Sequence, residues 1–491
     1  MLLAIFLIIF SAIAFRNVCH GAYLVIFSMP LYLWRFSVLG IPSTALEAMI
    51  YILFLVWIIN LRTFPFFVIP APCLPAGRKA GIHYCDKSKL FSQGLISNLA
   101  YTKHKIDSRQ IFTPPIGGFK IFWNDTKTGV RKNSMLNVGI TLLFLGVIIS
   151  TSISSDPKTS LGILKGWFLD PFLFFLVFIS IVKTKDQIVL SLAAWLFSGA
   201  AVSIISIFYL LNGELTFDGR LSAFFLSPNH LAMYLAPAFL IVFAFLIKNE
   251  PFVLKKILSE EAKLPIGNLV SFREAFFSRK LQVIVLTIIS IPLYFTHSYG
   301  AFLEISADLF YMFGKGIFKE GQSKKKKSYL AAALIILSLG VVFGYSKMDQ
   351  IENSNGRSSL HSRLMIWNAS GEMIKESPLV GIGPGTFEEK YLSLSSKFKE
   401  PYLEWAVPQP HNIFLAFYLQ TGLLGFIGFL LILLWFFKNK DETTILKVLM
   451  LYFLFHGLID TTYWKNDLAL MFWLVLGLSA IRSKNADSDK A

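Results

Sequence analysis

The feature that most constrains this chain is a series of long apolar runs. Residues 412–437 contain no ionisable side chain at all. A helix that crosses a bilayer needs about 20 predominantly apolar residues. Charged residues make up only 15% of the chain and the mean hydropathy is +0.60, whereas a soluble domain usually contains about 25% charged residues. The sequence therefore predicts an all-α polytopic membrane protein.

The same length criterion predicts about 12–13 transmembrane helices. The first fifteen residues resemble a signal peptide, but no basic residue precedes the apolar run, so we interpret them as a first membrane segment. The candidate spans lie at 2–15, 19–35, 45–64, 135–153, 167–184, 187–211, 230–248, 281–298, 300–318, 329–346, 412–437, 445–463 and 465–482.

The charges of the loops predict on which side of the membrane each loop lies. Segment 65–134 carries eleven Lys and Arg against three Asp, and 248–280 and 315–328 are also basic. Cytoplasmic loops collect Lys and Arg, so we place these segments in the cytoplasm. The long loop 347–411 has seven basic against eight acidic residues, and alternation places it outside. The net charge of +16 thus reflects the orientation of the protein in the membrane, and no nucleic-acid partner is expected.

These assignments divide the chain into six parts. They are N-terminal transmembrane helices (1–64), a cytoplasmic basic insert (65–134), central transmembrane helices (135–346), a large external catalytic loop (347–411), C-terminal transmembrane helices (412–482) and a cytoplasmic tail (483–491).

Three polar positions on the predicted external side are candidates for chemistry. Arg220 precedes a helix that opens at Ser227-Pro228-Asn229, where Asn229 would ordinarily be a helix cap. Arg363 begins a predicted amphipathic helix, with apolar residues recurring from 362 to 374, that would lie on the membrane. His411 lies at the start of the 412–437 span, where it is either an inert cap or a base.

Other patterns carry less information. The turn at 381–385 contains three glycines and is read as a plain turn rather than a phosphate nest. The pairs His456/Asp460 and Glu304/Asp308 are each four residues apart within predicted spans, hence on one helix face. Cys73, His83 and Cys85 are too few for a metal site, and there is no phosphate-binding GxxxxGK[ST] motif.

Three linked motifs resemble the O-antigen ligase and O-antigen polymerase superfamily. They are Arg220…Pro228-Asn229-x-x-Ala232, then Arg363-x-x-x-Trp367 with Pro-Leu-Val-Gly-Ile-Gly-Pro-Gly-x-Phe, and then Pro410-His411-Asn412 before a long helix. Their order and spacing agree over roughly 200–480.

This resemblance implies a GT-C-like membrane glycosyltransferase. It would move a glycan from undecaprenyl diphosphate to a hydroxyl of a glycan, lipid or protein acceptor, at the outer face of the cell inner membrane, with inversion and with neither metal nor cofactor. The family motifs assign His411 to catalysis and Arg220 and Arg363 to the diphosphate, with Asn229 and Asn412 in support.

The chain departs from the family at one position. Tyr299 stands where the family often has Arg, so one anion contact is missing or is supplied by Lys165 or Arg357. The alternative function is a solute transporter of the same superfamily, in which His456/Asp460 would be a proton relay.

Overall fold

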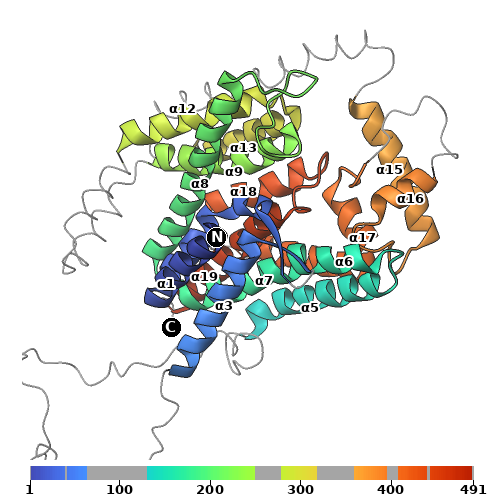
Figure 1. The fold of residues 1–491 in the computed structure, drawn as a ribbon, viewed down its shortest axis with the longest axis horizontal. Helices are drawn as coiled ribbons and strands as arrows, with labels where there is room; N and C mark the ends of the chain where they lie inside the picture. The colour runs from blue at the N-terminus through green and yellow to red at the C-terminus, as the bar shows by residue number, and fades with distance from the viewer. Residues whose placement is uncertain are drawn as a thin grey trace, which may run out of the picture.

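The computed structural model describes residues 2–38, 41–63, 130–248, 278–317, 359–394, 407–439 and 443–488. Almost all of this part is helical (Figure 1). Its helices are α1 (Leu2–Arg16), α2 (Val18–Phe27), α3 (Ala45–Thr63), α5 (Val130–Ser152), α6 (Pro157–Ile163), α7 (Asp170–Ile181), α8 (Lys185–Leu211), α9 (Pro228–Lys248), α12 (Arg279–Phe295), α13 (Tyr299–Ile317), α15 (Ser359–Glu376), α16 (Phe387–Ser393), α17 (Ile413–Lys438), α18 (Thr444–His456) and α19 (Asn466–Ser488).

Short non-α segments connect these helices at two places. A 3₁₀ turn, η1 (Met29–Leu33), follows α2, and an antiparallel hairpin of β1 (Arg35–Val38) and β2 (Ile41–Thr44) leads into α3. A π-helical segment, η3 (Leu164–Leu169), joins α6 to α7 into one continuous helix. Pro171, four residues after Trp167, has no N–H to donate to the Trp167 carbonyl, and this carbonyl accepts from the Tyr463 hydroxyl at 2.6 Å.

The prediction of an all-α polytopic membrane protein is confirmed, apart from the small hairpin. Five helices of the described part are long and apolar enough to cross a membrane: α5, the α6–η3–α7 segment (Pro157–Ile181), α8, α9 and α17. The shorter apolar helices are α1, α2, α3, α18 and α19. The predicted span 329–346, with most of 65–134 and all of 318–358, lies outside the described residues.

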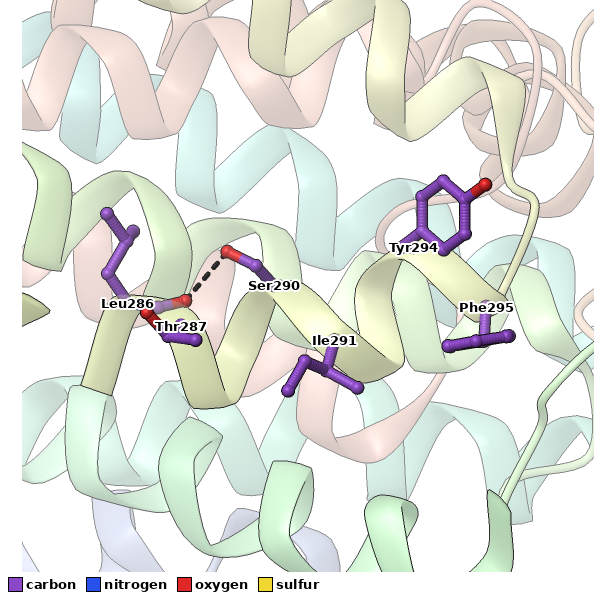
Figure 2. Close-up of a pocket in the computed structure, with 6 residues that line it drawn as sticks. All are labelled: Leu286, Thr287, Ser290, Ile291, Tyr294 and Phe295. Carbon is purple, nitrogen blue, oxygen red and sulfur yellow. Dashed lines mark hydrogen bonds between the residues drawn. The ribbon is translucent and has the colours of Figure 1, made fainter. Parts of the chain in front are cut away.

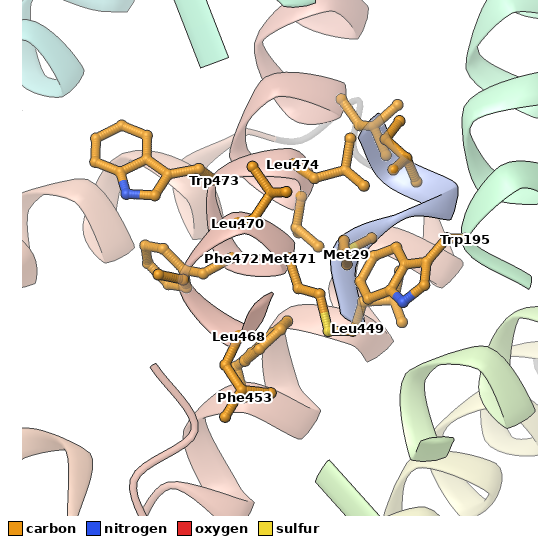
Figure 3. Close-up of a cluster of buried hydrophobic side chains, with 14 of the residues drawn as sticks. Met29, Trp195, Leu449, Phe453, Leu468, Leu470, Met471, Phe472, Trp473 and Leu474 are labelled. Atoms are coloured by element: carbon orange, nitrogen blue, oxygen red, sulfur yellow. The ribbon is translucent and has the colours of Figure 1, made fainter. Parts of the chain in front are cut away.

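The main core surrounds α19. This helix packs against α7, α18, α9 and η1, and nearly every side chain from Leu468 to Leu478 is fully buried. Figure 3 shows Trp473, Phe472 and Met471 of α19 among Leu449 and Phe453 of α18, Met29 and Trp195. Because the stretch from Leu468 to Leu478 is apolar on every side of the helix, it is buried on every side.

Helices α5 and α17 approach each other more closely than ordinary side chains allow. Gly139 and Gly146 of α5 face Gly428 and Gly425 of α17, and an added Cβ would overlap the opposing backbone. Small residues permit such close approach between membrane helices. Near the start of α17, Gly422 (φ 69°) interrupts the helical geometry. The Gly381–Gly385 turn packs against this interruption.

The contacts of that turn decide between its two interpretations. The amide of Ile382 donates to the Leu419 carbonyl at 2.7 Å, and the amide of Gly385 donates to Gln420 Oε1 at 3.1 Å. Gly381, Gly383 and Gly385 all have positive φ, which glycine tolerates at little cost. The backbone of the turn therefore packs against α17, as expected for a plain turn.

Helix α15 confirms the helix predicted at 362–374, although it begins earlier, at Ser359. Its buried face does not need a membrane to cover it. Ile366, Ala369 and Met373 form a small second core with α16, the Gly turn and Leu419 of α17. In Figure 1, α15 and α16 accordingly lie together at one side of the molecule, beside α17.

One predicted helix boundary is wrong in a way that matters for the site. The span predicted at 445–463 ends at His456, with Gly457 as its C-cap, and a loop follows until α19. Asp460 is therefore not on the same helix as His456. It lies in the loop between α18 and α19.

Candidate functional site

Arg220 is held in a short loop between α8 and α9. The backbone of Thr216 donates to the Arg220 carbonyl at 2.9 Å, with Gly219 (φ 74°) closing the turn. The Arg220 guanidinium donates from Nε to the Thr296 carbonyl at 2.8 Å and from Nη2 to Asn229 Oδ1 at 2.6 Å. Burial lowers the pKa of Arg220, while Asp218 opposes that effect; an arginine still stays protonated.

Asn229 does not cap α9. The Ser227 hydroxyl oxygen accepts from the His230 amide instead, at 3.2 Å, which leaves the Asn229 side chain available for other contacts. Its amide group accepts from Arg220 and donates from Nδ2 to Asp460 Oδ2 at 3.1 Å. Asn229 is therefore a bridge between a guanidinium and a carboxylate.

Asp460 is the centre of the cluster, and the sequence did not single it out for this role. The carboxylate is only 4% exposed and accepts from Asn229, from the Thr461 amide at 2.8 Å and from His411 Nδ1 at 3.2 Å. Burial alone would raise its pKa, but His411, His456 and Arg363 outweigh burial and hold the pKa of Asp460 below its usual range. The carboxylate is therefore ionised at neutral pH.

His411 lies immediately before α17 in an unusual backbone conformation. Its φ is 46°, a region that costs free energy for residues with a Cβ and that recurs at functional sites. Asn412 follows as the helix cap, accepting from the amides of Phe414 and Leu415, and donates to the Leu458 carbonyl at 3.0 Å. About a third of the His411 side chain is exposed. With Nδ1 turned to Asp460, Nε2 is the ring nitrogen left for a substrate.

Arg363 reaches the same loop from α15. Its Nε donates to the Ile459 carbonyl at 2.6 Å, one residue before Asp460. The sequence had placed Arg363 at the start of this helix, but α15 begins at Ser359 and Arg363 lies in its second turn. The loop 457–460 thus contacts both Arg363 and the His411–Asn412 segment.

These groups surround a cavity of about 640 Å³. Its lining comes from elements that are far apart in the sequence: Asp218, Gly219, Arg220, Asn229, His297, Ser298, Tyr299, Gly300, Arg363, His456, Ile459 and Asp460. His297, which lies two residues before the start of α13, also has a positive φ of 46°. The cavity therefore has two guanidinium groups and two carboxylates in its wall, and His411 is bonded to the buried carboxylate, Asp460.

An apolar groove runs along α12 next to the cavity (Figure 2). It has a volume of about 330 Å³ and is lined by Leu286, Thr287, Ser290, Ile291, Tyr294 and Phe295. Figure 2 shows these side chains in a row along one helix, with Ser290 turned back to the Leu286 carbonyl. The ring of Tyr294 packs 5.7 Å from that of His297, so the groove ends where the cavity wall begins.

The three remaining predicted site residues, Lys165, Arg357 and Tyr299, have different outcomes. The Lys165 ammonium lies 2.5 Å from Glu47 Oε2 and 3.9 Å from Asp170 Oδ2, and Lys165 does not line the cavity. Arg357 is outside the described residues. Tyr299 lines the cavity at the start of α13. The structure thus brings together Arg220, Asn229, Arg363, His411 and Tyr299, adds Asp460, and sets Lys165 apart.

Residues 284–430 match the family model for O-antigen ligase. This range extends from α12 into α17 and includes Tyr299, Arg363 and His411, whereas Arg220, Asn229 and Asp460 lie outside it. No curated protein matched the chain in a sequence comparison. The family match supports the O-antigen ligase and polymerase superfamily for this chain, and with it a membrane enzyme of the ligase or polymerase type.

Proposed function

We propose that this protein transfers a glycan from undecaprenyl diphosphate to an acceptor hydroxyl at the external face of the inner membrane. The observation that carries the proposal is the hydrogen-bonded chain Arg220–Asn229–Asp460–His411 in and beside a cavity that also holds Arg363. Such a chain joins a group that binds anions to a group that accepts protons. Glycan transfer from a diphosphate requires both.

The two guanidinium groups stabilise the leaving group. As the bond between the sugar and the phosphate breaks, negative charge accumulates on the diphosphate, and arginine binds phosphate oxygens through two parallel N–H donors. Nε of each arginine donates to a backbone carbonyl, Thr296 for Arg220 and Ile459 for Arg363. These contacts orient the guanidinium planes before substrate binds, and preorganised donors are worth several kcal/mol in the transition state.

His411 acts as the general base. Its Nδ1 is directed to the ionised Asp460, which fixes the ring and favours the tautomer with the lone pair on Nε2. Nε2 accepts the proton of the acceptor hydroxyl as its oxygen attacks the anomeric carbon. Displacement from the side opposite the diphosphate inverts that carbon.

The groove on α12 suits the lipid part of the donor. Ile291 and Tyr294 are 38% and 47% exposed on this helix, and the groove ends beside His297 in the cavity wall. A polyprenyl chain along α12 would bring its diphosphate to Arg220, because Leu221 is tied to the end of α12 by a 2.8 Å bond to the Phe295 carbonyl.

The test uses the purified protein with a polyprenyl-diphosphate-linked oligosaccharide and a saccharide acceptor. We expect His411→Gln to lose about 10²–10⁴-fold in kcat, the range of general-base catalysis, while donor binding is kept. Glutamine can donate and accept hydrogen bonds but cannot act as a base. His20→Gln on α2 is the matched control and should transfer normally. Near-normal turnover of His411→Gln would contradict the assignment of His411 as the base.

A further inference from the structure

Four buried polar groups lie between α13 and α18, directly behind the cavity. Glu304, Asp308, Tyr452 and His456 are between 0% and 6% exposed. Within the described part of the chain, Glu304 Oε1, Asp308 Oδ2, the Tyr452 hydroxyl and His456 Nδ1 have no hydrogen-bond partner. Buried polar atoms in folded proteins nearly always have one. Four such atoms between the same two helices indicate a binding site for water or another polar group.

The four groups form a ladder that starts at the cavity. On α13, Gly300, Glu304 and Asp308 follow one another at intervals of four residues, and on α18 His456 and Tyr452 are also four apart, so each set occupies one helix face. The two helices pack together. A Cβ on Gly300 would lie 3.5 Å from His456 Nε2, and the rings of His456 and Tyr452 are 5.3 Å apart.

The rise of an α-helix sets the depth of this ladder. At 1.5 Å per residue, Glu304 lies about 6 Å and Asp308 about 12 Å along α13 from Gly300. Gly300 and His456 line the cavity, so the ladder begins in its wall and continues into the helical bundle. The charged groups that line the cavity are Asp218, Arg220, Arg363 and Asp460. Helix α9 packs on both α13 and α18 and contains no Asp, Glu, Lys, Arg or His between Leu231 and Ile247.

We propose that Glu304, Asp308, Tyr452 and His456 bind water and protons, and that this ladder receives the proton released during glycan transfer. The inference rests on the proposed function. Two carboxyl groups in an apolar interior cannot both be ionised without a counter-charge. In this proposal the pair holds one proton between them, which leaves one carboxylate to accept a second. Ionisable residues within membrane helices commonly have this role.

The proton balance of the transfer explains why such a ladder is useful. The O–H bond of the acceptor breaks as its oxygen bonds to the anomeric carbon, and the electron pair of the old C–O bond leaves with the diphosphate. The proton moves to His411 and then, through water, to His456 and the carboxylate of the ladder. A diphosphate head group and a sugar in the 640 Å³ cavity displace bulk water from it, so a protein group must hold the proton until the products leave.

The first experiment detects the ladder without turnover. Infrared spectra of the purified protein should contain a band of protonated carboxylic acid that shifts in D₂O within minutes, as expected for acids in contact with water. Asp308→Asn and Glu304→Gln should each reduce this band. A band that is the same in both variants and in the wild type would overturn the proposal.

The second experiment links the ladder to transfer. Tyr452→Phe removes a hydroxyl that has no hydrogen-bond partner among the described residues, so a purely structural role predicts unchanged turnover. The proposal predicts a kcat lower by roughly tenfold, less than for loss of a direct base, with a larger solvent isotope effect and an unchanged KM. Tyr23→Phe is the matched control, since the Tyr23 hydroxyl is also buried without a partner in the described chain but lies on α2.

The two experiments separate this inference from the proposed function. Absence of transfer by the wild-type protein would reject the proposed function and would leave the infrared test valid. Normal transfer and a normal isotope effect in Tyr452→Phe would reject the ladder as a proton acceptor and would leave the roles of Arg220, Arg363 and His411 intact.

Discussion

Two buried clusters of charged residues in this protein use similar residue types for different purposes. In the first, Lys165 is paired with Glu47 and lies 3.9 Å from Asp170, and Tyr51 donates to Asp170 at 2.6 Å. One cation there faces two acids of the protein. In the second, Arg220, Arg363 and His411 surround the single buried carboxylate of Asp460, with Asp218 at the rim.

The difference is one of space. The Lys165 cluster is closed, since its cation is paired with acids of the chain itself. The Asp460 cluster instead places two guanidinium groups in the wall of a cavity of about 640 Å³. An anion that enters this cavity can therefore reach both guanidinium groups. Charge alone does not distinguish the two clusters, whereas charge together with space does.

The largest effect is expected from Asp460→Asn, which removes the only buried carboxylate of the second cluster. The amide cannot hold His411 in the required tautomer or stabilise its charged form, so we expect kcat to fall about 10²–10⁴-fold with little change in donor affinity. Steady-state kinetics and a donor-binding measurement check this. Asp218→Asn is the control: it lies 3.8 Å from Arg220 but is 41% exposed, and exposed ion pairs contribute little.

The pH profile provides a second measurement on the same residue. Since His411, His456 and Arg363 hold the pKa of Asp460 below its usual range, its carboxylate stays ionised as the pH falls to about 5, and is protonated only in stronger acid. Asp460 is therefore not expected to cause a decline of kcat in mildly acidic solution. A wild-type profile that stays flat down to pH of about 5 would contradict the use of a neutral imidazole as base.

A smaller loss is expected when each arginine of the site is replaced by lysine. Arg220→Lys and Arg363→Lys keep the charge but lose the planar fork and the bond from Nε to a backbone carbonyl. We expect kcat/KM for the lipid-linked donor to fall roughly 10- to 100-fold in each variant, as for loss of a buried charge-assisted bond. Inorganic pyrophosphate should also inhibit both variants less. Variants that transfer at wild-type rates would show that phosphate is not bound through the guanidinium planes.

The sequence predicted most helices because hydropathy alone specifies them, but it located the site only in part. The end of α18 was misplaced because Leu458 and Ile459 continue the apolar pattern, although Gly457 followed by Asp460-Thr461-Thr462 is a recognisable helix end. That error paired Asp460 with His456 on one helix face, whereas Asp460 is bonded to His411. The capping role expected of Asn229 was wrong because Ser227, two residues earlier, supplies the cap.

The partner of Lys165 could not be predicted from the sequence at all. Glu47 is 118 residues away along the chain, and it meets Lys165 only because α3 packs against the α6–η3–α7 segment. Pattern and spacing report on neighbours within one helix, whereas pairing between helices depends on packing. The same limit applies to the ladder: the spacing of Glu304 and Asp308 was visible in the sequence, but the packing of α13 against Tyr452 and His456 of α18 was not.

The smallest effect on transfer, and the sharpest contrast with the second cluster, is expected from Lys165→Met. Loss of this cation leaves Glu47, which is 7% exposed, as an uncompensated buried acid, and breaking a buried pair costs roughly 3 kcal/mol. The melting temperature in detergent should therefore fall, while kcat per folded molecule stays within about twofold, the scatter expected for a remote site. The double variant Glu47→Gln with Lys165→Met removes both charges, and its stability should recover in large part, because the cost arises from one partner left alone. If Lys165→Met instead kept its melting temperature and lost donor affinity, Lys165 would belong to the diphosphate site, and the distinction drawn between the two clusters would fail.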